Sequence, residues 1–240
     1  MNLIMSGSIT SGYGIQPEVL RWPDYLAKNP LNEKFEIATK DGLTYEEALG
    51  MLRLNNFRGE ILILYFGTRV GWPRISKNLA TFFPKLSKNE RYLELSAFRS
   101  TRKFASFRRG KKIFFRNFAK FIGIFLNQYR PDIPLKKCLT DLDLLFAEST
   151  QRFKRVIFLQ HHHLNSNRLR YENSKYDKFY NSILSFASER FEKNLIIVEL
   201  PSDIFSSRYF LSDCVHFNLE GHKKMGNFLS HFLATLEDKQ

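Results

Sequence analysis

The chain has 240 residues, of which 43% are hydrophobic, so it can form one domain with a sizeable core and is not a predominantly disordered protein. No apolar run approaches the roughly 20 residues of a membrane-spanning helix, and two cysteines, Cys138 and Cys214, are too few for a disulfide framework. The apolar N-terminal stretch is too short for a secretory signal, so we expect a cytoplasmic protein with reduced thiols, although its net charge of +13 also suits the inner membrane face.

Strands and helices are predicted to alternate along the chain. Short apolar runs at 2–5, 35–39, 60–67, 155–160 and 194–200 are typical of strands covered on both faces. Helical patterns lie at 17–28, 44–54, 176–191 and 219–236, and Thr44 with Glu47 forms a capping-box pattern at the start of the second. This order predicts an α/β fold of three layers, α/β/α, with a parallel sheet of about five strands.

A long segment interrupts this alternation between the third and fourth strands. We predict a helical insertion at about 72–154, within a single domain that spans 1–240. Aromatic residues recur in it at helical spacing, namely Phe114, Phe118, Phe121, Phe125 and Tyr129. The insertion also carries most of the net charge, because 99–120 contains nine basic residues and no acidic one. A helix in 99–125 can therefore lie on an anionic membrane surface, or pack its phenyl rings on the sheet or on another subunit.

Small and polar residues follow each of the first four predicted strands, at the edge where reacting groups gather in open parallel sheets. In chain order they are Ser8, Gly42, Gly67-Thr68-Arg69 and His161-His162-His163. Asp213 and His216 precede the last helix. A serine nucleophile needs a base, and the base needs a carboxylate that orients it, so these residues are candidates for a triad with Ser8. The alternatives are a simple Gly–Ser turn at Ser8 and helix capping by the Asp213–His216 loop.

The same residues make the chain similar to the SGNH, or GDSL, hydrolase family over nearly its whole length. Ser6-Gly7-Ser8-Ile9-Thr10 resembles the first family block, Gly-Asp-Ser-x-Thr, and Trp22-Pro23 resembles a pair that follows it. Gly42 fits the second-block glycine, and Gly67-Thr68-Arg69-Val70 fits the third block, Gly-x-Asn-Asp. Asp213 to His216 fits the last block, with Gly221-His222 after it. Among the departures from the family pattern, Gly7 replaces an Asp and Arg69 replaces an Asn.

The resemblance implies a serine-dependent acyl-ester hydrolase, an esterase or deacetylase, that needs no cofactor or metal. Ser8 would be the nucleophile, His216 the base and Asp213 its partner, with Gly42, Gly67 and Arg69 at the oxyanion or substrate. The implied substrate is an acylated carbohydrate or a surface-polysaccharide building block. An O-acyltransferase in polysaccharide biosynthesis would use the same residues, and a catalytically impaired glycan-binding relative is the other alternative.

Four further features carry less weight in the prediction. Nucleic acid is not an expected partner, because the basic segment lies in the insertion and the candidate catalytic residues lie elsewhere. Adjacent side chains of the His161–His163 run would point in opposite directions on an extended chain, which disfavours a metal site. The remaining interpretation is that these histidines line the substrate cleft. We expect His222 to be structural and Cys214 to serve in packing.

Overall fold

A computed structural model describes residues 1–7, 10, 21–26, 34–67, 70–76, 78–79, 82, 118–159, 170–190, 193–211 and 216–237, with only the backbone at 170–173. Its centre is a parallel sheet of five strands in the order β2-β1-β3-β6-β7. The strands are β1 (Asn2–Ser6), β2 (Phe35–Thr39), β3 (Gly59–Tyr65), β6 (Phe153–Leu159) and β7 (Leu195–Val198). The five predicted strands are thus confirmed, with ends that shift by a residue or two.

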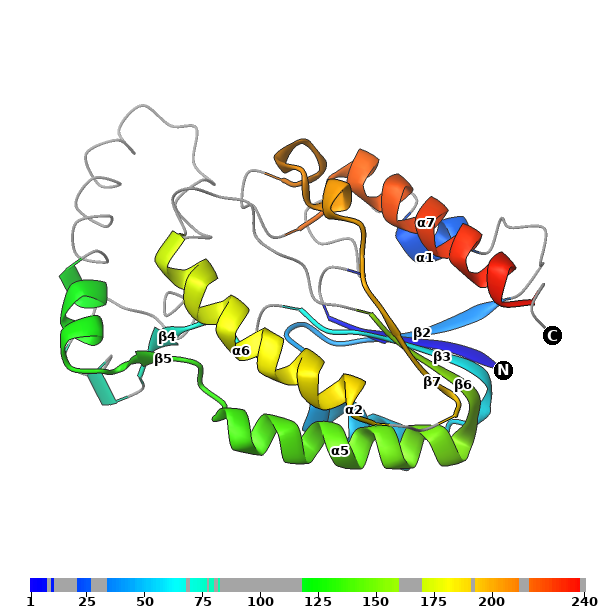
Figure 1. Cartoon of the computed structure of the whole chain (residues 1–240), viewed down its shortest axis with the longest axis horizontal. Helices are drawn as coiled ribbons and strands as arrows, with labels where there is room; N and C mark the ends of the chain where they lie inside the picture. Colours follow the sequence, from blue (N-terminus) through cyan, green and yellow to red (C-terminus); the bar gives the residue numbers. More distant parts are fainter. Residues whose placement is uncertain are drawn as a thin grey trace.

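Helices cover both faces of this sheet (Figure 1). One layer contains α2 (Tyr45–Leu54), α5 (Leu135–Arg152) and α6 (Arg170–Ser188). The other contains α1 (Trp22–Leu26), α7 (Leu219–Glu237) and two 3-10 helices, η2 (Ser202–Phe205) and η3 (Ser207–Tyr209). Alternate residues of β3 face the two layers, Leu64 toward the first and Ile63 toward the second. The predicted three-layer α/β/α fold is confirmed, and no described helix is long and apolar enough to cross a membrane.

Helix α2 begins with the predicted capping box. The Thr44 hydroxyl accepts the Glu47 N–H at 3.3 Å, and the Glu47 carboxylate accepts the Thr44 N–H at 2.9 Å. The last helix also agrees closely with its prediction, whereas α6 starts at Arg170, six residues before the predicted start. Within the segment 17–28, which was predicted to be helical, the structure describes 21–26, and helix α1 lies there.

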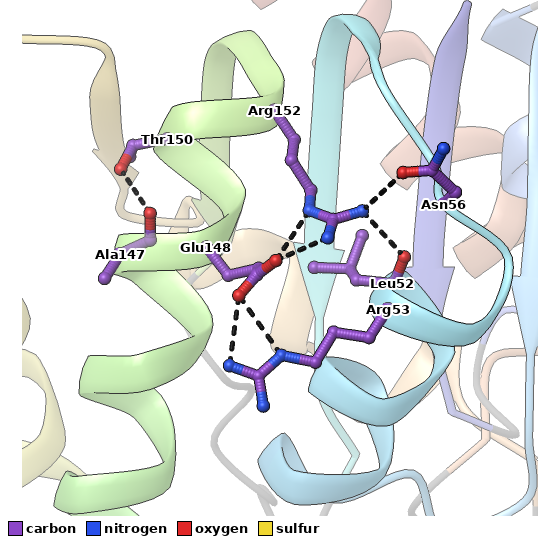
Figure 2. Close-up of polar contacts among 7 residues, drawn as sticks. All are labelled: Leu52, Arg53, Asn56, Ala147, Glu148, Thr150 and Arg152. Atoms are coloured by element: carbon purple, nitrogen blue, oxygen red, sulfur yellow. Dashed lines mark hydrogen bonds and ion pairs between the residues drawn. The ribbon is translucent and has the colours of Figure 1, made fainter.

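The neighbouring helices α2 and α5 are joined by a charged cluster (Figure 2). The Glu148 carboxylate accepts hydrogen bonds from the side chains of Arg53, at 3.0 and 3.1 Å, and Arg152, at 2.8 Å through its Nε. Arg152 also donates to the Leu52 carbonyl at 3.2 Å, near the C-terminus of α2. These hydrogen bonds, that of Arg152 first, hold the pKa of Glu148 below its usual range.

The segment predicted as an insertion has a helix of the main layer at its end. Helix α5 packs against α2 and β6, so 135–152 is the crossover helix between β3 and β6. Two short strands precede it, β4 (Arg74–Ile75) and β5 (Tyr129–Arg130), which pair antiparallel and bring the two ends of the intervening segment together. Residues 118–125 are helical, and 101–117 lie outside the described residues, so the insertion as a basic element stays a prediction.

Candidate active site

The chain segments after β1, β2 and β3 meet at Gly7. In the sheet, Ser6 at the end of β1 is in register with Thr39 of β2 and Tyr65 of β3. A Cβ atom on Gly7 would lie 3.6 Å from the Gly67 backbone N and 3.9 Å from the Leu43 backbone N. The three loops therefore lie close together at Gly7, with room for about one methyl group between them, one peptide bond from Ser8.

Buried hydrogen bonds hold the residues on either side of Ser8, which itself lies outside the described residues. The Gly7 carbonyl accepts the Thr10 N–H at 3.1 Å. The Thr10 hydroxyl is buried, donates to the Ser6 hydroxyl and accepts the Trp22 indole N–H at 3.1 Å. Residues 6, 7 and 10, on either side of Ser8, are thus held by hydrogen bonds.

Gly42 lies in a tight turn after β2, where its conformation requires glycine. Its φ angle is +64°, in the left-handed region that side chains disfavour, and the Lys40 carbonyl accepts the Leu43 N–H at 3.0 Å across the turn. This turn carries the Leu43 backbone to its close approach to Gly7. Backbone N–H groups in a turn of this kind are the donors from which oxyanion holes are built.

His216 lies on a short loop whose backbone is fixed on both sides. Phe210 and Phe217 form an antiparallel bridge, and the Leu211 N–H donates to the His216 carbonyl at 2.7 Å. The His216 residue is 8% exposed. Asp213 lies between these bonded residues in the sequence, at 212–215, which is outside the described residues.

The start of α7 is capped by Asn218. Its side-chain oxygen accepts the Gly221 N–H at 3.0 Å, and its side-chain nitrogen donates to the Arg208 carbonyl at 2.6 Å. Gly221 lets the start of α7 lie close to the backbone of η3, because a Cβ on residue 221 would be 2.2 Å from the Tyr209 carbonyl oxygen. Asn218 therefore fills the capping role that the sequence left open for the Asp213–His216 loop.

A hydrogen-bonded chain through Trp22 connects the turn after β1 with the start of α7. The Trp22 backbone N–H donates to His222 Nδ1 at 3.3 Å, while its indole N–H donates to Thr10. His222 is 1% exposed, and burial, with smaller contributions from Arg21 and His216, lowers its pKa to about 4. His222 is thus a buried structural histidine, as predicted.

The described residues include some of the predicted site residues and not others. Gly42, Gly67 and His216 are placed as above, whereas Ser8, Arg69, Asp213, Cys214 and His161–His163 lie outside the described residues. Sequence reasoning missed the Ser6–Thr10–Trp22 chain and the cap at Asn218, although Thr10 and Trp22 belong to the motifs it singled out. The other thiol, Cys138, is buried, and burial raises its pKa to about 12, which makes it unsuited to nucleophilic chemistry.

No family model matches the sequence, and no curated protein matches it significantly. Solved structures do match. An acetylxylan esterase from Geobacillus stearothermophilus, Axe2, is 11% identical with a TM-score of 0.55, over 94% of this chain and 90% of that one. A member of the lipolytic G-D-S-L family from Veillonella parvula is 10% identical with a TM-score of 0.54, over 94% and 93%. The psychrotrophic esterase EstA from Pseudoalteromonas is 14% identical with a TM-score of 0.52, over 99% and 100%. Over nearly its whole length, this chain therefore has the fold of these lipolytic enzymes and esterases.

Proposed function

We propose that this protein is a serine-dependent acyl-ester hydrolase with Ser8 as nucleophile, His216 as general base and Asp213 as the carboxylate that orients it. The observation that carries the proposal is the close approach of three loops at Gly7, one residue from Ser8. The carboxyl ends of parallel strands are where such folds bind and convert substrates. The Trp22 hydrogen bonds also join the turn after β1 to His222 in α7, the helix that follows the His216 loop.

In the proposed reaction, the Ser8 hydroxyl attacks the ester carbonyl while His216 accepts its proton. The tetrahedral intermediate collapses when the alcohol leaves with the proton from His216, and an acyl-serine remains. Water then attacks the acyl group, its proton passes to His216, and the carboxylic acid is released with Ser8 restored. Asp213 stabilises the imidazolium that forms in both steps.

The negative charge of the intermediate would be held by backbone donors near Gly7. Gly42 and Ser8 would supply N–H groups, with Gly67 lining the same corner and Arg69 reaching the oxyanion or an anionic part of the substrate. An arginine differs from the family's asparagine in charge and length, so Arg69 is the residue most able to change the reaction. Losing one oxyanion donor costs roughly 10²–10³ in rate.

An acylated carbohydrate is the proposed substrate class, with a surface-polysaccharide building block as the specific candidate. The structural likeness to an acetylxylan esterase and to EstA supports an ester substrate. If a sugar hydroxyl replaces water in the second step, the same residues perform O-acyl transfer. An assay that measures both free acetate and acylation of an added sugar acceptor distinguishes hydrolysis from transfer.

A fluorophosphonate probe tests the nucleophile directly. We expect the folded protein to be labelled on the peptide that contains Ser8, and the label to disappear in Ser8→Ala and in His216→Ala. The matched control is Ser202→Ala, an exposed serine on η2, which should be labelled like the wild type. If the folded wild-type chain is not labelled at all, the hydrolase proposal fails and the glycan-binding alternative is favoured.

Turnover of p-nitrophenyl acetate tests Arg69. If Arg69 contacts the oxyanion, Arg69→Ala should lower kcat by ~10²-fold or more with little change in KM, because that contact strengthens in the transition state. A rise in KM alone would mean that Arg69 binds an anionic part of the substrate instead.

A further inference from the structure

The helical residues 118–125 have one packed face and one exposed face. Ala119 is fully buried and, with Ile122, packs against Ile75, Leu79 and Tyr129. The opposite face and the residue after the helix carry large apolar side chains that are exposed to solvent. These residues, which we call the phenyl face, are Phe118, Phe121, Ile124, Phe125 and Leu126.

The phenyl face is not a covered core stripe. The sequence grouped its rings with Tyr129, but Tyr129 is buried on the packed side, with Lys120 over its ring at 5.9 Å. By contrast, Phe121 is 67% exposed and Phe125 is 80% exposed. Ala119 and Ile122 make the contacts that attach this helix to β4 and β5. A contiguous exposed apolar surface of this kind indicates an interaction site.

The chain around the phenyl face is strongly basic. Between Glu94 and Asp132 the sequence contains ten basic residues and no acidic one. Covalent geometry limits how far their charges can lie from the face: the Cα atoms of Arg116 and Phe118 are at most about 7 Å apart, and those of Lys111 and Phe118 at most about 25 Å. Positive charge therefore accompanies the exposed rings whatever the conformation of the segment.

We propose that the phenyl face docks on the surface of an anionic phospholipid bilayer, with its rings among the acyl chains and the neighbouring cations at the lipid phosphates. Interfacial helices combine an apolar face with basic residues in this way, and each cation near an anionic leaflet strengthens binding about fivefold. A second copy of this chain would bring two such basic segments together, which like-charge repulsion opposes. Single-stranded nucleic acid is stacked by aromatic rings, whereas Ile124 and Leu126 offer aliphatic surface that suits hydrocarbon.

Docking would orient the rest of the molecule. In Figure 1, residues 118–125 lie at the end of the molecule away from both termini, on the side toward which the carboxyl ends of the strands point. The candidate active site is built from those carboxyl ends. A bilayer at the phenyl face would therefore lie on the side of the molecule toward which the site opens, rather than behind it, which favours substrates that are themselves held at a membrane.

Vesicle cosedimentation tests the proposal with the full chain. We expect binding to equimolar phosphatidylglycerol–phosphatidylcholine vesicles at low salt, weak binding to pure phosphatidylcholine, and release in 0.5 M salt, a concentration that screens charges beyond about 4 Å. Phe121→Ser with Phe125→Ser should weaken binding at least tenfold while the Tm changes little, because both rings are exposed. The matched control is Leu54→Ser on α2, which is 87% exposed and should bind like the wild type.

Several results would overturn the proposal. The proposal fails if the wild-type protein does not sediment with the anionic vesicles at low salt. It also fails if the variant with Phe121→Ser and Phe125→Ser binds the vesicles as well as the wild type does. A dimer that the same substitutions dissociate, without any vesicle binding, would make the face a subunit interface. Tight binding of single-stranded RNA that depends on Phe121 and Phe125 would make it a nucleic-acid site. Ser8→Ala should bind vesicles unchanged, so this test and that of the hydrolase proposal fail independently.

Discussion

Protonation of the buried His222 should destabilise the fold as the pH falls below about 6.5. Its Nδ1 accepts the Trp22 N–H at 3.3 Å, and its side chain is shielded from water. Burial lowers its pKa to about 4 in the folded state, whereas an unfolded chain has the ordinary value near 6.5. Between these values the unfolded state binds a proton that the folded state does not, so stability decreases with falling pH.

The size of this effect follows from the two pKa values. A folded-state pKa of about 4 corresponds to about 3 kcal/mol of lost stability once both states are protonated. Most of that loss, about 2 kcal/mol, should already occur between pH 7.5 and pH 5. Contributions of acidic side chains over this interval are shared by the wild type and the His222 variant compared below, so they cancel in the difference.

Urea unfolding at pH 7.5 and 5, followed by tryptophan fluorescence, measures the difference. His222→Asn places an oxygen near the position of Nδ1, so it can accept the Trp22 N–H but does not titrate. The wild type should lose about 2 kcal/mol more than this variant on acidification. His231→Asn, an exposed histidine on the same helix, is the control and should lose as much as the wild type. Equal losses in the wild type and His222→Asn would refute the reasoning.

Four other substitutions probe contacts of the fold, three of them around the candidate site. Gly221→Ala should lower the free energy of unfolding by about 3 kcal/mol or prevent folding, because its Cβ would lie 2.2 Å from a carbonyl oxygen. Gly7→Ala should shift the thermal midpoint little, because the nearest atom to its Cβ would be 3.6 Å away. Trp22→Phe removes the donor to Thr10 but keeps an aromatic ring, so calorimetry should show a loss of about 1–2 kcal/mol in the free energy of unfolding. If the proposed function is right, kcat should also fall roughly tenfold without a matching change in KM. Glu148→Gln should cost about 1 kcal/mol or less at pH 7, and urea unfolding should show that this cost disappears at low pH, as the wild-type carboxylate with its lowered pKa is protonated.

Local features of the fold were predictable because the information for them lies within a few adjacent residues. Strands buried on both faces are continuous apolar runs, which is why 2–5 was predicted within one residue of the ends of β1, whose residues are all buried. The capping box needs only Thr44 and Glu47, three residues apart. The alternation of strands and helices then restricted the architecture to a layered parallel sheet.

The candidate site was predictable only in part. Motif spacing singled out Gly42, Gly67 and His216, and the rule that sites form at the carboxyl ends of parallel strands predicted a common edge. Which loops touch depends on the strand order β2-β1-β3-β6-β7, since β1 must lie between β2 and β3 for the three loops to meet. That order is decided by packing between distant parts of the chain, and the link from Trp22 to His222 spans 200 positions of sequence.

The phenyl face shows the same division between sequence and tertiary structure. The spacing of Phe118, Phe121 and Phe125 shows that these rings share one side of a helix, but it does not say whether that side is covered. The structure decides this, because Ala119 and Ile122 attach the helix to its neighbours and leave the rings exposed. Periodicity relates residues within one element, whereas burial depends on which other elements pack against it.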